Sequence, residues 1–170
     1  MADTESLLSA LRVYRDARRT FLELLGCPTS NRDPLAEFAE HLAEAVLGGD
    51  LAPSRVQKDY DLVTESGESV QVRYLANPAD VPWVNGHVID FRGSCDRYAL
   101  LIVENLDPKA MIVISREGLA GVCALLGKRH PNQDVTLQLT EANFRAIVAS
   151  PGQFERHGVV VMDLTKFSVL

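Results

Sequence analysis

The sequence predicts an α/β (α+β) domain in which a mixed β-sheet is flanked by helices, with an extra helix at the N-terminus. Two amphipathic helical segments fill most of the first 47 residues, and two almost wholly apolar runs at 98–104 and 109–115 are typical of strands covered on both faces. Further along, strand-type and helix-type segments follow without a repeat or a linker. With 170 residues, 46% of them hydrophobic and 24% charged, we expect 1–170 to form a single domain.

The first helix is predicted over residues 4–25, inside an N-terminal segment at 1–28. Its apolar side chains recur at three- and four-residue spacing, which predicts one buried face. Gly26 and Pro28 then end the helix. The residues expected on the buried face are Leu7, Ala10, Tyr14, Ala17, Phe21 and Leu25.

The second helix is predicted over residues 34–47, with Asp33 as its cap and Pro34 at its first position. One apolar stripe is expected to face the core, and Glu40 is expected at the edge of the polar face. The stripe consists of Leu35, Phe38, Ala39, Leu42 and Val46, while Glu37, His41 and Glu44 are expected to point away from it.

Two hairpins are predicted next. Residues 60–74, YDLVTESGESVQVRY, contain two short β-type runs around the turn-like ESGES. In the segment 81–91, Asn85 and Gly86 can supply the positive φ angles that a tight two-residue turn needs. The remaining elements are expected to be strands at 98–104, 109–115, 135–139 and 159–164, a helix at 116–127, and a helix that begins after its cap Thr140.

Composition and missing motifs narrow the function classes. Apolar runs too short to cross a bilayer and an N-terminus without a secretion pattern predict a cytoplasmic protein with no membrane partner. The net charge of −6 opposes unguided binding to nucleic acid. GxGxxG, GxxxxGK[ST] and GxSxG are all absent, which argues against dinucleotide binding, P-loop hydrolysis and α/β-hydrolase chemistry.

The cysteines and histidines are scattered along the sequence. Cys27, Cys95 and Cys123 are odd in number and form no CxxC pair, so their spacing argues against a structural zinc site and against a disulfide framework. Cys123 falls on the inward side of the helix predicted at 116–127, so we expect it to be a core residue.

One group of polar residues has the composition of a metal-dependent site. Gln71 and Arg73 alternate with Val72, so they share one face of a strand, and Asp61 can meet them across the hairpin. Carboxylate and amide oxygens suit Mg²⁺ or Mn²⁺, and a nearby cation would stabilise the charge that develops during phosphodiester hydrolysis. The alternative is that these are ordinary polar residues on a half-exposed strand.

These residues also carry a resemblance to a known family. The order of a helix glutamate, an aspartate and then Gln-x-basic resembles the PD-(D/E)xK nuclease superfamily, specifically its restriction-endonuclease-like, Mrr-like branch in which Gln replaces the second acid. The resemblance covers about residues 31–164 and implies a restriction-endonuclease-like core there. The matching elements are Ala39, Glu40 and Leu42, then Lys58, Tyr60 and Asp61, then Gln71, Val72 and Arg73.

The resemblance implies a role for each of these positions. Asp61 would be the principal metal ligand, Gln71 the second, the backbone carbonyl of Val72 the third, and Glu40 would act through water or on a second ion. The cofactor would be weakly held Mg²⁺ or Mn²⁺, with no organic cofactor. Arg73 stands where the family has Lys, and a guanidinium that stays protonated cannot serve as a general base.

Two functions remain open at this point. The first is a metal-dependent DNA endonuclease-like protein, fully active or detuned, that hydrolyses, or once hydrolysed, phosphodiester bonds. The second is a catalytically inactive pseudo-nuclease that serves as a DNA- or protein-binding accessory module. For either function the expected partners are DNA and a second copy of the chain or another protein.

Basic and aromatic side chains outside this group were considered as nucleic-acid contacts. Arg12, Arg15 and Arg19 share a face of the first helix, which is either a phosphate-contacting surface or simply a solvated one. For Trp83 we expect packing rather than base stacking. Lys58 and Arg92 are further candidates for contacts to the phosphate backbone, as are His87 and Arg97 near the second predicted hairpin.

Overall fold

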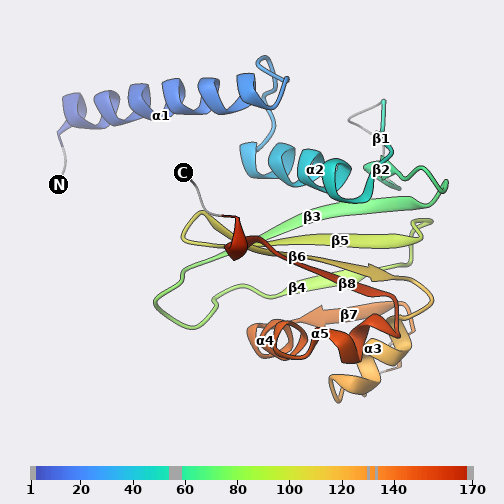
Figure 1. The fold of residues 1–170 in the computed structure, drawn as a ribbon. Helices are drawn as coiled ribbons and strands as arrows, with labels where there is room; N and C mark the ends of the chain where they lie inside the picture. The colour runs from blue at the N-terminus through green and yellow to red at the C-terminus, as the bar shows by residue number, and fades with distance from the viewer. Residues whose placement is uncertain (1–2, 54–58, 130, 133, 168–170) are drawn as a thin grey trace.

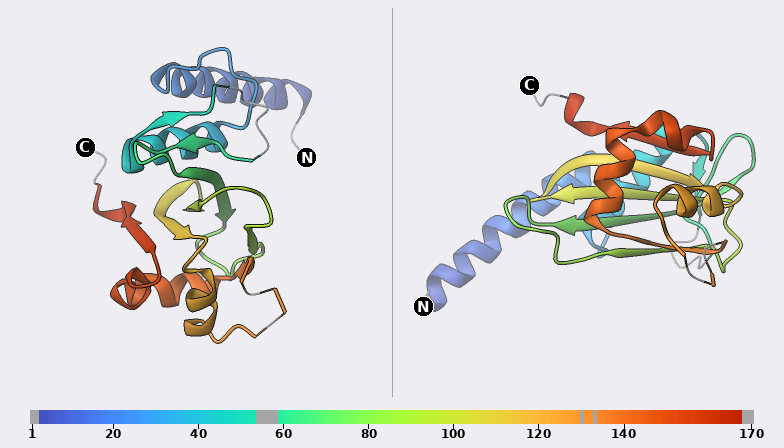
Figure 2. Two further views of the ribbon diagram at one scale, coloured as in Figure 1. Left: turned by 90° about the vertical axis from the view of Figure 1, so that its right-hand side faces the viewer. Right: turned by 90° about the horizontal axis from the view of Figure 1, so that it is seen from below.

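The computed structural model describes residues 3–53, 59–129, 131–132 and 134–167, and within them a mixed β-sheet is flanked by helices. The main sheet has six strands in the order β1-β2-β3-β5-β6-β8, and β4 pairs with β7 in a separate two-stranded sheet. Helix α2 covers one face of the main sheet, while β4, β7 and the later helices lie on the other side (Figures 1 and 2). The predicted α/β class is confirmed at this level.

The elements have the following bounds. The helices are α1 Thr4–Leu24, α2 Pro34–Leu47, α3 Leu119–Leu125, α4 Glu141–Ala149, α5 Pro151–Glu155 and the 3₁₀ turn η1 Leu164–Lys166. The strands are β1 Asp50–Leu51, β2 Leu62–Val63, β3 Ser69–Asn77, β4 His87–Asp90, β5 Arg97–Glu104, β6 Asp107–Ser115, β7 Thr136–Leu139 and β8 Val159–Asp163. The sequence pattern missed β1 and α5, and the helix predicted at 116–127 is shorter than expected.

The central strands are covered on both faces, as their apolar runs predicted. On β5, Ala99 and Leu101 face α2, whereas Leu100 and Ile102 face the side of β4 and β7. Strands β3 and β5 run parallel, and the other neighbouring pairs of the main sheet are antiparallel. A strand buried on both faces cannot show apolar–polar alternation, which explains why both runs read as continuously hydrophobic.

The prediction of a hairpin at 81–91 is wrong. Only β4 forms there, and it pairs with β7 rather than with the residues before Asn85. The Asn85 backbone instead exchanges hydrogen bonds of 2.9 and 3.1 Å with the Asn77 side chain at the end of β3. The tight two-residue turn lies between β5 and β6, where Asn105 and Leu106 adopt φ angles of 51° and 64°.

Helix α1 forms where predicted, but its expected buried face is largely exposed. Leu7 is 60% exposed and Tyr14 is 57% exposed, and Leu22 is the one fully buried residue of this helix. The helix projects from the body and meets α2 only near its own C-terminal end (Figures 1 and 2). There the Phe21 ring lies 5.9 Å from that of Phe38. The helical pattern was therefore right, but nothing in the described chain covers most of the apolar face.

Helix α2 presents a different face to the sheet than its apolar stripe predicted. Ala39 and Ala43 pack on the sheet, and Glu37 and Glu40 are buried, at 1% and 4% exposure. Of the stripe residues, Phe38, Leu42 and Val46 are only half-buried and border an apolar groove of about 510 Å³. The groove is lined by Phe38, Leu42, Ala45, Val46, Asp107, Pro108, Met162, Leu164 and Phe167. The buried glutamates are accommodated because nearby polar groups bind them, as described below.

Candidate functional site

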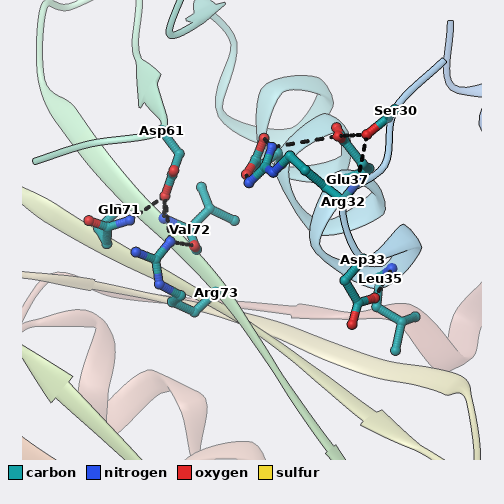
Figure 3. Close-up of polar contacts among 10 residues, drawn as sticks. Ser30, Arg32, Asp33, Leu35, Glu37, Asp61, Gln71, Val72 and Arg73 are labelled. Atoms are coloured by element: carbon teal, nitrogen blue, oxygen red, sulfur yellow. Dashed lines mark hydrogen bonds and ion pairs between the residues drawn. The ribbon is translucent and has the colours of Figure 1, made fainter. Parts of the chain in front are cut away.

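The Asp61 carboxylate meets the start of β3. Asp61 lies directly before β2, and its N–H donates to the Val70 carbonyl across the hairpin at 2.8 Å. Its Oδ2 accepts from the Val72 N–H at 2.8 Å, from Arg73 Nη1 at 2.9 Å and from the Gln71 amide nitrogen (Figure 3). Asp61, Gln71, Val72 and Arg73 therefore come together as the hairpin predicted.

The Arg73 guanidinium bridges two of the oxygens expected to bind a metal ion. Its Nη1 lies 2.9 Å from Asp61 Oδ2 and also donates to the Val72 carbonyl at 2.6 Å. In Figure 3 this side chain lies between the two oxygens. A cation supplied by the chain itself thus occupies the hydrogen-bonding positions that a divalent ion would need on Asp61 and Val72.

Glu40 is held separately, on the other side of the sheet. Val70 and Val72 pack beneath α2, so Gln71 and Arg73, which alternate with them, face away from this helix. The carboxylate of Glu40 accepts from both terminal nitrogens of Arg32, with Nη1 at 2.8 Å from Oε2. This bond raises the pKa of Arg32. Glu40, which was also predicted to belong to the site, is therefore paired with Arg32, a residue outside the sequence motif.

Burial has the largest influence on the pKa of the Asp61 carboxyl group. It raises the pKa of Asp61 above the ordinary value of 3.8, and the nearby charge of Glu40 acts in the same direction. The Val72 N–H and the Arg73 charge lower this pKa but do not outweigh burial. The two carboxylates are thus electrostatically coupled although they lie on different sides of β3.

Gln71 and Arg73 open into a polar pocket of about 230 Å³. Its lining residues are Asp59, Gln71, Arg73, Asp90, Gly93, Cys95 and Tyr98. The sequence motif did not include Tyr98, which stands inside an apolar strand run and gave no polar signal. Its hydroxyl lies 2.6 Å from His87 Nε2.

His87 and Tyr98 form a neutral pair beside this pocket. Burial raises the pKa of Tyr98 to about 12. Burial, and then the charge of Arg73, lowers the pKa of His87 below 6.5. At neutral pH the Tyr98 hydroxyl therefore keeps its proton beside a neutral imidazole, and the His87 tautomer decides which of the two groups donates the hydrogen bond.

The predicted nucleic-acid contacts are dispersed. Lys58 lies outside the described residues. Arg92 pairs with Asp90 at 2.5 Å, and Arg15 and Arg19 approach Asp16 at 2.9 and 3.7 Å, while Arg12 is exposed on the same helix. On α1, the single carboxylate of Asp16 therefore offsets only part of the positive charge of these arginines.

Two further residues considered for phosphate or base contacts are engaged in the fold. The Trp83 ring stacks on Phe144 at 5.2 Å, and its Nε1 donates to Glu104 at 2.9 Å, which confirms packing. Arg97 is ion-paired with Glu68 at 2.9 Å.

Comparison with known proteins does not identify the chain. No model of a known protein family matches it, and no curated protein matches it either. In the part of the chain that the structure describes, no helix combines the length and the hydrophobicity needed to cross a membrane.

Proposed function

We propose that this chain is a restriction-endonuclease-like protein that does not hydrolyse phosphodiester bonds and instead serves as a binding module. The observation that carries the proposal is the position of Arg73. A metal ion bridging Asp61 and Val72 would have to displace a guanidinium hydrogen-bonded at 2.9 and 2.6 Å to the same two oxygens. Because that guanidinium remains protonated at any physiological pH, the competition cannot be relieved by losing a proton.

The arrangement of Glu40 supports the same reading. In the metal-dependent mechanism this carboxylate would bind a water molecule or a second ion. Here it is buried and receives two hydrogen bonds from Arg32. Both acids of the motif thus have an arginine partner, which reduces the negative charge available to attract Mg²⁺.

The placement of the motif on the fold supports the restriction-endonuclease-like assignment. The motif hairpin of β2 and β3 lies in a mixed sheet covered by α2, and Asp61, Gln71 and Arg73 are adjacent as the family order implies. These observations support an assignment of the fold, and that assignment holds whether or not the protein is catalytically active.

Helix α1 is the surface proposed to contact the partner. It exposes arginines, which suit a DNA backbone, together with apolar side chains such as Leu7 and Leu11, which suit a protein. Salt dependence separates these two partners, because counterion release makes DNA binding fall steeply as salt rises.

The second candidate is the metal-dependent endonuclease, and one observation favours it. The Arg73 side chain is 46% exposed and borders the open polar pocket, so it could rotate away from Asp61 without disturbing the core. Gln71 and the Val72 carbonyl would then be accessible to an ion.

A cleavage assay separates the two candidates. Purified protein, Asp61→Ala and Arg73→Lys are incubated with plasmid DNA and with oligonucleotides in Mg²⁺ or Mn²⁺. We expect no cleavage by the unaltered chain and none by Asp61→Ala. Metal-dependent cleavage by the unaltered chain that disappears in Asp61→Ala would overturn the proposal in favour of the endonuclease.

Direct metal binding provides an independent test. By calorimetry with Mn²⁺, we expect no binding at the Asp61 site until the guanidinium is removed in Arg73→Ala. Loss of the new binding in the double variant with Asp61→Ala would assign it to this site. If the unaltered chain binds Mn²⁺ and Asp61→Ala does not, the claim that Arg73 keeps metal ions from the Asp61 site is contradicted.

DNA binding is tested by fluorescence anisotropy over a range of salt concentrations. The triple variant Arg12→Ala/Arg15→Ala/Arg19→Ala is compared with Arg156→Ala, which removes an exposed arginine from a different part of the surface. If DNA is the partner, only the triple variant weakens binding and reduces the salt dependence. No DNA binding by any of these proteins leaves a protein as the partner.

A further inference from the structure

Three metal-ligand side chains converge at the junction between α1 and α2. Cys27 follows the end of α1, and its N–H donates to the Leu22 carbonyl at 2.9 Å. Glu37 and His41 are four residues apart on α2 and so lie on one face of the helix. One ligand atom from each of the three side chains lies within 4.8 Å of the others.

The chemistry of these ligands favours a borderline-soft metal ion. Thiolate sulfur and imidazole nitrogen favour Zn²⁺ over Mg²⁺, which prefers oxygen ligands. A thiolate and a carboxylate with a neutral imidazole carry two negative charges, which Zn²⁺ would balance. Charge balance matters here because Glu37 is almost completely buried, and Arg32, the cation 3.7 Å from it, is shared with Glu40.

His41 is oriented as a metal ligand would be. Its Nδ1 lies 3.4 Å from Glu44 Oε2, so a proton on Nδ1 would face this carboxylate and leave the lone pair on Nε2. Nε2 is buried and has no hydrogen-bond partner among the described residues. A carboxylate that holds the second nitrogen of a ligating histidine is a common feature of zinc sites.

Glu37 is also fixed by neighbouring groups. Its Oε1 accepts from Ser30 Oγ at 2.5 Å and lies 3.7 Å from Arg32 Nη1 (Figure 3). Ser30 is in turn tied to Cys27, because the Ser30 N–H donates to the Cys27 carbonyl at 3.0 Å. The short turn between the helices therefore positions both the thiol and the carboxylate.

We propose that Cys27, Glu37 and His41 form a binding site for Zn²⁺, with Glu44 as a positioning residue. Three protein ligands leave a fourth position for water or an external ligand. A bound ion would join the end of α1 to α2 and fix the direction in which α1 projects. This site is separate from the Asp61 cluster and does not depend on the proposed function.

Cobalt titration is the first test. The full chain is treated with a chelator and titrated with Co²⁺, whose tetrahedral thiolate complexes absorb in the visible and near-ultraviolet regions. We expect one equivalent to produce both absorptions and Zn²⁺ to displace it. The near-ultraviolet band should be lost in Cys27→Ser and retained in Cys123→Ala, which removes a thiol buried elsewhere in the core.

A second test uses the unaltered chain and so avoids any folding defect of a variant. Cys27 is half-exposed whereas Cys95 and Cys123 are buried, so a maleimide reagent should label Cys27 first. We expect Zn²⁺ to slow this labelling and Mg²⁺ to leave it unchanged, as followed by peptide mass spectrometry.

The positioning role of Glu44 gives a graded test. Glu44→Gln should lower the Zn²⁺ affinity about 10- to 100-fold without removing the thiolate band, as is usual for groups that orient a ligand. Absence of a thiolate–cobalt band in the unaltered chain, a band that persists in Cys27→Ser, or labelling that Zn²⁺ does not slow would each overturn the proposal.

Discussion

The cluster around Asp61 and the cluster around Cys27 both gather metal-ligand side chains, but they differ in how their negative charge is balanced. At Asp61, Arg73 places a guanidinium nitrogen against the very oxygens that an ion would use. At Cys27, Arg32 lies 3.7 Å from Glu37, and a buried imidazole nitrogen faces no hydrogen-bond partner among the described residues. Ligand-type residues therefore indicate a metal site where a buried ligand atom lacks a hydrogen-bond partner among the described residues, rather than where a guanidinium is already hydrogen-bonded to the ligand oxygens.

The largest effect is expected from Arg32, which supports the carboxylates of α2. Arg32→Ala should reduce the free energy of unfolding by about 3 kcal/mol, because it leaves the buried Glu40 without its bidentate partner. Urea denaturation measures the change. The control is Arg92→Ala, which breaks an exposed pair with Asp90 and should change stability by less than about 1 kcal/mol. Equal losses in the two variants would contradict the role of Arg32.

Removing the Asp61 carboxylate should have the next largest effect. Asp61→Ala deprives the Val72 N–H and the Gln71 amide of their acceptor, and we expect a loss of about 1–2 kcal/mol in urea denaturation. If the Arg73 and Asp61 side chains interact, the cost of Arg73→Ala depends on whether Asp61 is present. Arg73→Ala should then destabilise the Asp61→Ala variant less than it destabilises the unaltered chain. Strict additivity would show that the two side chains are not coupled.

The pH dependence of stability should report the burial of Asp61. Because its folded-state pKa is raised above 3.8, the folded chain retains the proton over a range where the unfolded chain loses it. The contribution of Asp61 to stability is thus greatest below the unfolded pKa and is lost as pH rises through the folded pKa. The stability of the parent relative to Asp61→Asn should fall over this range, as measured by urea denaturation at a series of pH values. A rise would contradict the raised pKa.

A smaller effect should appear at His87. Its pKa is lowered by burial and by Arg73, so Arg73→Ala should move it back toward 6.5, as followed by NMR of the imidazole. The stability contributed by neutral His87 is present above the unfolded pKa and is lost as pH falls through the folded value. An unchanged His87 pKa in Arg73→Ala would indicate that burial alone causes the shift.

Sequence patterns predicted most of the secondary structure because they follow local physics. The caps at Asp33 and Thr140 form as expected, with Asp33 accepting from the Leu35 N–H at 2.8 Å. The apolar runs of β5 and β6 are central strands. The hairpin placed at Asn85 failed because β4 pairs with β7, nearly fifty residues further on, and a local turn signal carries no information about that partner.

The site was predictable only in part, for a similar reason. Alternation along β3 placed Gln71 and Arg73 together, and the hairpin brought Asp61 to them. Arg32 was missed because it lies in a polar turn without periodicity, and its partner Glu40 was assigned to the edge of a polar face. The group of Cys27, Glu37 and His41 has no spacing motif, since it depends on how α1 and α2 meet.

The turn at Asn105 and Leu106 has a consequence for the order of folding. It joins β5 and β6, two interior strands of the main sheet, through a two-residue connection, so closing this loop loses little chain entropy. Strands β3 and β8 add to this hairpin only after much longer loops close. We expect the β5–β6 hairpin to be largely formed in the folding transition state, with φ-values there higher than those measured for substitutions in β8.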